Sequence, residues 1–240
     1  MTKESEGLKK MSIYAIADLH LSLGTQKPMD VFKGWDNYVE KLRQNWEKVV
    51  KNSDTVVVAG DISWALKLED SIEDFKFLES LPGKKIILKG NHDYWWSTAK
   101  KINDFFNENG IKSVSLLHNS AIFVENTCVC GTRGWLYNSE ASGDKKILLR
   151  ECGRLERSIK IAEDQGFEPL VFLHYPPVYG EKESSEIINI LVERNIKKCY
   201  YGHIHGGKFS TKLKTGMYKG VSLELIACDY LDFCPKLVRK

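Results

Sequence analysis

The chain has 240 residues, a length that fits one large domain or two small ones. Its apolar share of 42% excludes a disordered chain, and its 18 glycines and 6 prolines exclude collagen-like and low-complexity sequence. The 35 basic and 32 acidic residues leave a formal charge of +3, which is too close to balance to indicate a nucleic-acid or membrane partner.

The N-terminal sequence MTKESEGLKK is charged and lacks the apolar segment of a secretion signal. No apolar run approaches the roughly 18 residues that a membrane-spanning helix needs. Six scattered cysteines without C-x-x-C spacing are expected to be reduced and buried. We therefore predict a cytoplasmic protein that forms a single domain over residues 1–240, with residues 1–11 as a flexible leader.

Five short apolar runs, each followed at once by polar residues, are predicted to be strands buried on both faces. These runs span residues 12–17, 55–59, 85–88, 170–173 and 198–201. Amphipathic patterns between and after them predict helices. The expected helices span residues 37–50, 66–81, 97–109, 148–165 and 184–194. This alternation indicates an α/β protein with largely parallel central strands.

The pattern changes between residues 114 and 132, where short β-like runs follow one another without helices. These runs span residues 114–117, 121–125 and 128–130. Residues 220–228 also alternate between apolar and polar side chains, as strands do. We expect these segments to belong to a second sheet, so that two sheets are flanked by helices.

Five of the six histidines come directly after predicted strands. In open α/β sheets, ligands bind outside the carboxyl ends of the strands. Nine polar side chains are expected at this edge: Asp18, His20, Asp61, Asn91, His92, Asp93, His174, His203 and His205. Nitrogen and oxygen donors without a thiolate suit Mn, Fe, Zn, Co or Ni.

So many potential ligands exceed the four that one zinc ion typically takes, and they favour two divalent metal ions that share a bridging carboxylate. Two ions about 3.5–4 Å apart lower the pKa of a bound water and stabilise both the attacking and the leaving oxygen of a displacement. A rigid, positively charged centre of this kind favours a phosphate ester as substrate.

Five motifs follow one another between Asp18 and His205: D-x-H, G-D, G-N-H-D, a single His, and G-H-x-H. Each motif alone is weak, but all five in this order resemble the calcineurin-like metallophosphoesterase superfamily. This resemblance implies an α/β (α+β) fold, namely a four-layer αββα sandwich of two mixed β-sheets flanked by helices. It also implies a dinuclear metal site at the edge of the sheets.

The resemblance further implies a role for each residue of the motifs. The first metal would be held by Asp18, His20, Asp61 and His205. The second would be held by Asp61, Asn91, His174 and His203, so that Asp61 bridges the two ions. His92 would act as the general acid that protonates the leaving oxygen, and Asp93 would orient His92 or a group behind the ligands.

Two departures from related patterns narrow the function. Protein Ser/Thr phosphatases of this superfamily carry G-D-x-x-D-R-G, whereas this chain has Gly60-Asp61-Ile62-Ser63-Trp64-Ala65 and lacks the second acidic residue and the arginine. The segment ADLHLS is similar to lipid-precursor pyrophosphatases, but those enzymes tend to carry Arg where His92 stands. Both comparisons are therefore partial.

Several other residues are candidates for contact with the substrate. Trp95 and Trp96 follow the G-N-H-D motif, and they either pack at the start of a helix or form an aromatic wall. Arg133 either reaches a second phosphate or a phosphodiester oxygen, or lies at the surface. His118 belongs to no motif and is expected at the surface.

The sequence favours a metal-dependent phosphoesterase that attacks a small phosphate ester with a metal-bridging hydroxide. A phosphodiester is slightly favoured over a phosphomonoester, because His92 suits a poor leaving group and the chain has no large cap domain. Two alternatives are a catalytically weak interaction scaffold with this fold and an enzyme similar to protein Ser/Thr phosphatases. The small net charge disfavours a nuclease, and the oligomeric state is left open.

Overall fold

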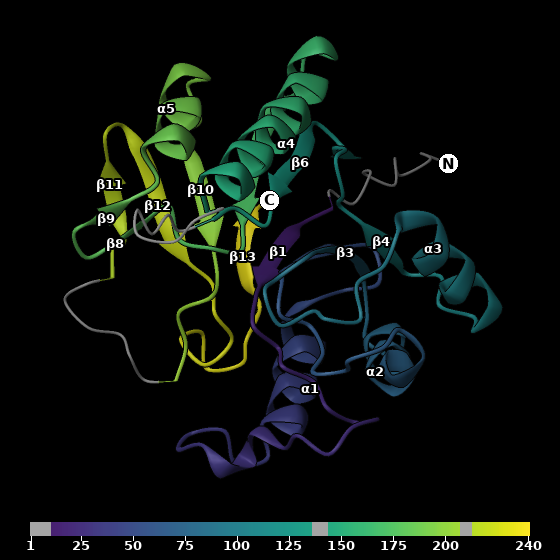
Figure 1. The fold of residues 1–240 in the computed structure, drawn as a ribbon. Coiled ribbons are helices and arrows are strands. Elements are labelled where there is room, and N and C mark those ends of the chain that lie inside the picture. The colour runs from purple at the N-terminus through teal and green to yellow at the C-terminus, as the bar shows by residue number, and fades with distance from the viewer. Residues whose placement is uncertain (1–10, 136–143, 207–212) are drawn as a thin grey trace, which may run out of the picture.

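The computed structural model describes residues 11–135, 144–206 and 213–240. The expected leader lies almost wholly outside these residues. The described part folds into two large mixed β-sheets that face each other, and five α-helices cover their outer faces (Figure 1).

The first sheet has the strand order β13-β1-β2-β3-β4. Its parallel strands are β1 (Ile13–Ile16), β2 (Thr55–Ala59), β3 (Lys84–Leu88) and β4 (Val114–Leu116). Strand β13 (Lys236–Arg239) pairs antiparallel with β1 at the edge. The carboxyl ends of β1, β2 and β3 therefore lie side by side.

The second sheet has the order β11-β12-β10-β7-β6-β5. Its four central strands are parallel: β12 (Val221–Leu225), β10 (Lys198–Tyr201), β7 (Glu168–Leu173) and β6 (Thr127–Thr132). The edge strands β11 (Gly216–Tyr218) and β5 (Ile122–Val124) are antiparallel to their neighbours. A separate two-stranded ribbon joins β8 (Val178–Tyr179) and β9 (Lys182–Glu183).

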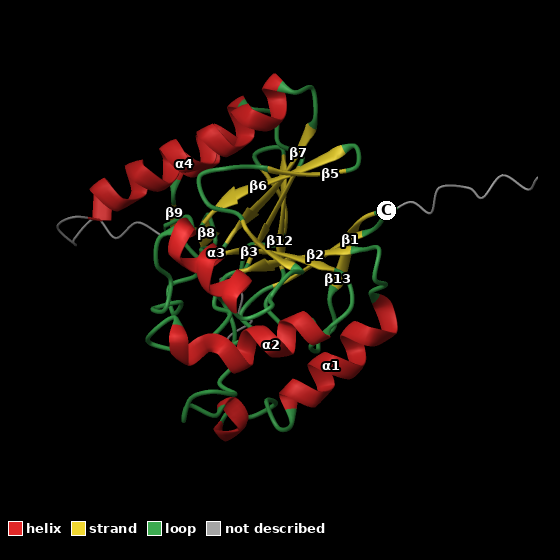
Figure 2. Ribbon diagram, turned by 90° about the vertical axis from the view of Figure 1, so that its right-hand side faces the viewer, coloured by secondary structure: helices red, strands yellow, loops and turns green. Residues whose placement is uncertain are grey.

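The helices form the two outer layers. Helices α1 (Tyr38–Val49), α2 (Ile72–Ser80) and α3 (Ala99–Glu108) pack on the first sheet. Helices α4 (Asp144–Asp164) and α5 (Ser185–Glu193) pack on the second. Figure 2 shows the order, with α4 on one side of the strands and α1 and α2 on the other. The predicted αββα sandwich is confirmed.

Side-chain alternation along the strands explains these layers. In β2, Val56 and Val58 pack with the helices, whereas Val57 and Ala59 face the second sheet. In β7, Leu173 packs toward α4 and α5, whereas its neighbour Phe172 lies between the sheets. Because successive residues of a strand point to opposite faces, a strand covered on both sides must be apolar throughout.

Four features differ from the expected elements. The segment 114–117 was expected in the second sheet, but β4 pairs in parallel with β3 in the first sheet, because α3 returns the chain to that edge. Strands β11 and β13 and the β8–β9 ribbon were not predicted, because all are short and β13 alternates only between half-buried and exposed residues. The helix expected over residues 66–81 is a 3-10 turn (Glu69–Ser71) followed by α2. Helix α4 begins four residues earlier than expected, ahead of its first buried apolar residue, Leu148.

Two further expectations concern the cysteines and the membrane. All six cysteines are free, and five of them are buried, which agrees with the prediction that they serve as small apolar residues. Within the described part of the chain, no helix combines the length and the apolar composition required to cross a bilayer.

Lys85 is a buried cation in β3 whose titration can be tested. Its Nζ donates to the carbonyl oxygen of Leu81 and, at 3.1 Å, to Ser113 Oγ. Burial lowers the pKa of Lys85 to about 8, and the Glu79 carboxylate opposes this shift. Between about pH 8 and the ordinary lysine value of 10.5, the unfolded chain binds a proton that native Lys85 has lost, so the free energy of unfolding rises with pH.

We therefore expect wild type to gain about 1–3 kcal/mol of stability relative to Lys85→Met when the pH rises from 8 to 10. Urea unfolding of both proteins at several pH values measures this difference. A stability difference that stays constant over the interval would show that Lys85 is not titrating there.

Candidate metal centre

The candidate ligands lie where five parallel strands end. Asp18 and His20 follow β1, Asp61 follows β2, and Asn91 follows β3. From the second sheet, His174 follows β7, and both His203 and His205 follow β10. The two facing sheets thus contribute to a single cluster at one edge of the sandwich.

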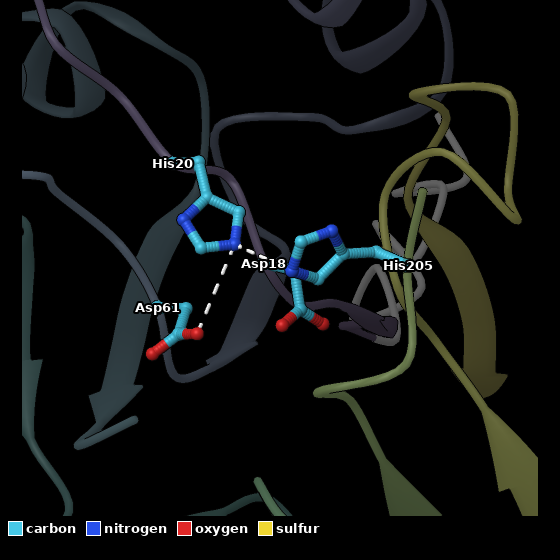
Figure 3. A group of neighbouring side chains, drawn as sticks. All are labelled: Asp18, His20, Asp61 and His205. Carbon is cyan, nitrogen blue, oxygen red and sulfur yellow. Dashed lines mark hydrogen bonds and ion pairs between the residues drawn. The ribbon is translucent and has the colours of Figure 1, made fainter. Parts of the chain in front are cut away.

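Two groups of metal-binding side chains share one carboxylate. The first comprises Asp18, His20, Asp61 and His205, and one potential ligand atom from each lies within 4.8 Å of the others (Figure 3). The second comprises Asp61, His174 and His203 under the same limit. The first is the set that the family resemblance implies, and the second holds three of the four residues that it implies, with Asp61 common to both.

Asn91 belongs with the second group. Its Oδ1 lies 2.7 Å from His174 Nε2 and 2.8 Å from His203 Nδ1. All seven residues that the sequence suggested as metal ligands therefore converge, although they are spread over almost 190 positions of the chain. Amide oxygen, carboxylate oxygen and imidazole nitrogen together make a donor set suited to borderline divalent metals.

The orientation of the donor atoms fits bound cations. Asp61 Oδ2 is buried and has no hydrogen-bond donor among the described residues. It lies 3.8 Å from His20 Nε2 and 3.4 Å from His174 Nε2. His20 Nε2 is also 3.0 Å from His205 Nε2. Lone pairs that converge in this way are unfavourable when buried, unless a cation or a proton lies between them.

The electrostatics of the cluster point the same way. Burial raises the pKa of Asp61 to about 6, and it raises the pKa of Asp18 well above its usual value, with the charge of Asp61 adding to the effect. Burial also lowers the pKa of His174 and of His203 to about 3. Neutral imidazoles are the form that binds metal, and cations would reverse the shifts of the two carboxyls.

A hydrogen bond fixes the ring of His174. Its Nδ1 lies 3.0 Å from the carbonyl oxygen of Ala59, which can only accept a hydrogen bond. Nδ1 therefore carries the proton, and the lone pair of Nε2 faces Asn91 and Asp61. Such a contact behind the ligand is typical of metal-binding histidines.

Asp93 ties the ends of β2 and β3 together. Its carboxylate accepts hydrogen bonds from the backbone N–H groups of Asp61 at 3.0 Å, Ile62 at 2.8 Å and Gly90 at 2.7 Å. Of the two roles expected for Asp93, these contacts match the support of groups behind the ligands. They hold the backbone in place at Asp61, after β2, and at Gly90, which directly precedes Asn91 after β3.

His92 lies beside the ligands. Its backbone N–H donates to Asp61 Oδ1 at 2.7 Å. Its half-buried ring lies 5.5 Å from the ring of His20 and 4.5 Å from that of Trp64, measured between centroids. Burial lowers the pKa of His92, while the charge of Asp61 opposes this shift. The side chain is thus close to the centre but belongs to neither metal-binding group.

Four of the candidate ligands have left-handed backbone conformations. The φ angles are 59° at Asp18, 46° at His20, 51° at Asp61 and 71° at His203. Residues other than glycine seldom adopt such angles, and each instance costs about 1–3 kcal/mol. Strain of this kind is common at functional sites, where the surrounding structure holds it in place.

Two glycines of the motifs make room for the ligands. A Cβ atom on Gly90 would lie 2.1 Å from Asp61 Oδ1 and 2.2 Å from the Asp61 backbone nitrogen. A Cβ atom on Gly202 would lie 2.6 Å from Asp18 Oδ2. These two glycines therefore let the ligand side chains approach the backbone closely.

We expect Gly90→Ala to displace Asp61 and to weaken metal binding by at least about tenfold, as is typical when contacts around metal ligands are lost. Titration of the metal-depleted protein with Mn²⁺ measures this change. Gly153→Ala is the matched control, because a Cβ atom there meets nothing within 4 Å and the backbone has no left-handed conformation. Equal Mn²⁺ affinities for the two variants would contradict the steric argument.

The aromatic residues divide between the core and the site. Trp95 is 2% exposed, packs against Phe75 and donates to Asp93, so it belongs to the core rather than to a pocket wall. Trp96 is partly exposed and lines a cavity. Sequence reasoning missed Trp64, whose ring stacks on His20 at 4.7 Å. The sequence feature that could have pointed to Trp64 is its position, because it stands where the G-D-x-x-D-R-G pattern has its second acidic residue.

Comparison with known proteins agrees with this geometry. The family model for calcineurin-like phosphoesterases matches residues 11–207. The chain therefore belongs to the calcineurin-like phosphoesterase family. No curated protein sequence matches the chain significantly.

Solved structures share the fold at low sequence identity. AQ665 of Aquifex aeolicus, a protein of unknown function, is 17% identical over 95% of both chains, with a TM-score of 0.52. TT1561 of Thermus thermophilus is 13% identical over 90% of this chain and 88% of its own, with a TM-score of 0.57. The phosphopantetheinyl hydrolase PptH of Mycobacterium tuberculosis is 16% identical over 91% and 89%, with a TM-score of 0.50.

Proposed function

We propose that this protein is a dinuclear-metal-dependent phosphoesterase that hydrolyses a small phosphate ester, with a phosphodiester preferred over a phosphomonoester. The observation that carries the proposal is the pair of metal-binding groups that share Asp61. One such group would serve a structural ion equally well. Two groups around one carboxylate are suited to act on both oxygens of a displacement at phosphorus.

In this proposal Asp18, His20, Asp61 and His205 hold one ion, and Asp61, Asn91, His174 and His203 hold the other. The ions supply an activated water and positive charge at the phosphate. The identity of the metals is open among Mn, Fe, Zn, Co and Ni, because the mixed nitrogen and oxygen donors suit all of them.

The chain's own residues would position the bridging carboxylate and protonate the leaving oxygen. Asp93 holds the backbone of Asp61 and Gly90 in place, so the bridging carboxylate needs little reorganisation. His92, anchored through its backbone to Asp61, would give a ring proton to the leaving oxygen. Trp64, stacked on His20, packs against one side of the cluster.

Two observations weigh against the alternative functions. A scaffold that had lost catalysis would be expected to lack ligands, but here every candidate ligand and His92 are in place. In place of the second acidic residue of protein Ser/Thr phosphatases stands Trp64, which packs against the cluster.

PptH is described as a phosphopantetheinyl hydrolase, and that activity is compatible with a small phosphodiester substrate.

The test is hydrolysis of bis-p-nitrophenyl phosphate and of p-nitrophenyl phosphate by purified protein supplied with Mn²⁺. We expect a higher kcat/KM for the diester, and loss of both activities after chelation, with recovery when Mn²⁺ is restored. A preference for the monoester would overturn the diester assignment. Failure to hydrolyse either compound with any of the five metals would overturn the proposal that the protein is a phosphoesterase.

A further inference from the structure

A cavity of about 260 Å³ lies beside the candidate metal centre, and we call it the side cavity. Its charged lining consists of Lys89, Arg133, Arg150, Glu151 and Arg154. Four cations and one carboxylate leave an excess of three positive charges. The volume is below the roughly 300–1,000 Å³ of pockets that hold whole drug-sized ligands, so it suits one group of a larger molecule.

The backbone places the side cavity next to the ligands. Lys89 follows β3 and precedes Asn91 by two residues. Arg133 follows β6, and its carbonyl oxygen accepts hydrogen bonds from the backbone N–H groups of His174 at 3.1 Å and Tyr175 at 2.8 Å. The cavity and the second metal-binding group are therefore built on the same strand ends.

The buried carboxylate of Glu151 organises the cations. It is fully buried on α4 and accepts hydrogen bonds from Thr132 Oγ1 and, at 2.7 Å, from Arg154 Nη1. Arg133 Nη2 lies 3.9 Å from it, and Arg150 Nε lies 3.8 Å from it. Three guanidinium groups thus surround one carboxylate, which cannot neutralise them all.

Two N–H groups of residues that line the side cavity lack a hydrogen-bond acceptor in the described part of the chain. Arg133 Nε and Trp96 Nε1 are buried N–H donors without an acceptor among the described residues. Unsatisfied buried donors are unfavourable, and an anion supplies the oxygens that they lack. The pKa of His118, also in the lining, is lowered first by burial and then by the positive charge of Arg154, which agrees with an excess of positive charge.

We propose that the side cavity binds a second phosphate group of the substrate, while the ester to be cleaved lies at the metal centre. Guanidinium groups bind phosphate through paired, charge-assisted hydrogen bonds, so several arginines in one cavity favour this anion. The inference rests on the proposed function, and it narrows the substrate to molecules with two separated phosphates. Trp96 and His118 would flank the part of the molecule between them.

Binding to the metal-depleted protein tests the cavity separately from catalysis. Without cations the metal centre lacks the positive charge that would hold a phosphate there, so inorganic phosphate is expected to bind in the side cavity. Calorimetric titration of wild type should give saturable binding. Arg150→Gln and Arg154→Gln should each weaken it about tenfold, the effect of losing one charge-assisted hydrogen bond.

Arg157→Gln is the matched control, because Arg157 is exposed on the same helix and does not line the cavity. Its phosphate affinity should equal that of wild type. Arg150 is 55% exposed, so its replacement tests the proposal even if Arg154→Gln, which removes the hydrogen bond to Glu151, unfolds the protein. No saturable binding to wild type, or an equal loss in the Arg157→Gln control, overturns the proposal.

A substrate pair then tests whether the cavity serves the reaction. Thymidine 3′-phosphate 5′-(p-nitrophenyl phosphate) and thymidine 5′-(p-nitrophenyl phosphate) differ only in the second phosphate. With Mn²⁺ we expect about tenfold higher kcat/KM for the first compound, and Arg150→Gln should abolish this preference. Equal kcat/KM values in wild type would overturn the substrate role. If neither compound is hydrolysed although phosphate binds, the proposed phosphoesterase function is wrong, whereas phosphate binding in the side cavity stands.

Discussion

Asp61→Ala should lose bound metal and hydrolytic activity together. Asp61 is the one carboxylate shared by the two metal-binding groups, so its removal takes a ligand from both. We expect metal content, measured by elemental analysis after Mn²⁺ reconstitution and desalting, to fall from about two equivalents to nearly none. Because both ions act on the same phosphate, activity should fall by more than the roughly 10²–10⁴-fold that a single general acid contributes.

Asp61→Asn is the companion variant that separates charge from folding. Asn tolerates the left-handed backbone at this position and keeps an oxygen that can accept from the His92 N–H group. The metal-depleted variant should therefore unfold at the same temperature as metal-depleted wild type, yet still bind metal poorly. Full retention of two ions in Asp61→Asn would show that Asp61 is not the bridging ligand.

His92→Ala should retain the metals and lose turnover. The contact of residue 92 with Asp61 is made by the backbone N–H, which alanine preserves, so the bridging carboxylate stays in place. We expect unchanged metal content and, with an alkyl phosphodiester as substrate, a decrease in kcat of about 10²–10⁴-fold, as for other general acids. Elemental analysis and steady-state kinetics on the same preparation measure both quantities.

The leaving group provides a sharper check on His92. A p-nitrophenolate ion leaves without a proton, whereas an alkoxide needs one. The deficit of His92→Ala should accordingly be larger for an alkyl phosphodiester than for bis-p-nitrophenyl phosphate. Equal deficits for the two substrates, or a loss of metal equal to that of Asp61→Ala, would assign His92 a role other than proton donation.

Regular patterns explain why much of the architecture was predictable. The buried runs around Val57 and Phe172 indicate strands covered on both faces, and parallel strands end at a common edge. That rule brings Asp18 and Asp61 together in the first sheet, and the packing of the two sheets face to face adds His205 from the second. Strand β13 escaped prediction because an edge strand with exposed residues lacks the apolar signal.

The side cavity was beyond the reach of the sequence for a different reason. Arg150, Glu151 and Arg154 belong to no motif, and their charges are typical of the solvated face of a helix. Only the packing of α4 against β6 brings Glu151 to Thr132 and, through it, the arginines to Arg133. Trp64 was missed similarly, since stacking on His20 depends on the course of two loops.

The residues with left-handed backbone at the strand ends restrict which substitutions this protein can accept. Asp18, His20, Asp61 and His203 keep a costly backbone that glycine would adopt freely. A glycine at any of these positions would relieve the backbone cost but would remove a candidate ligand and its buried contacts. Relief of backbone strain and retention of activity are therefore opposed here, and efforts to stabilise this protein should leave these four residues unchanged.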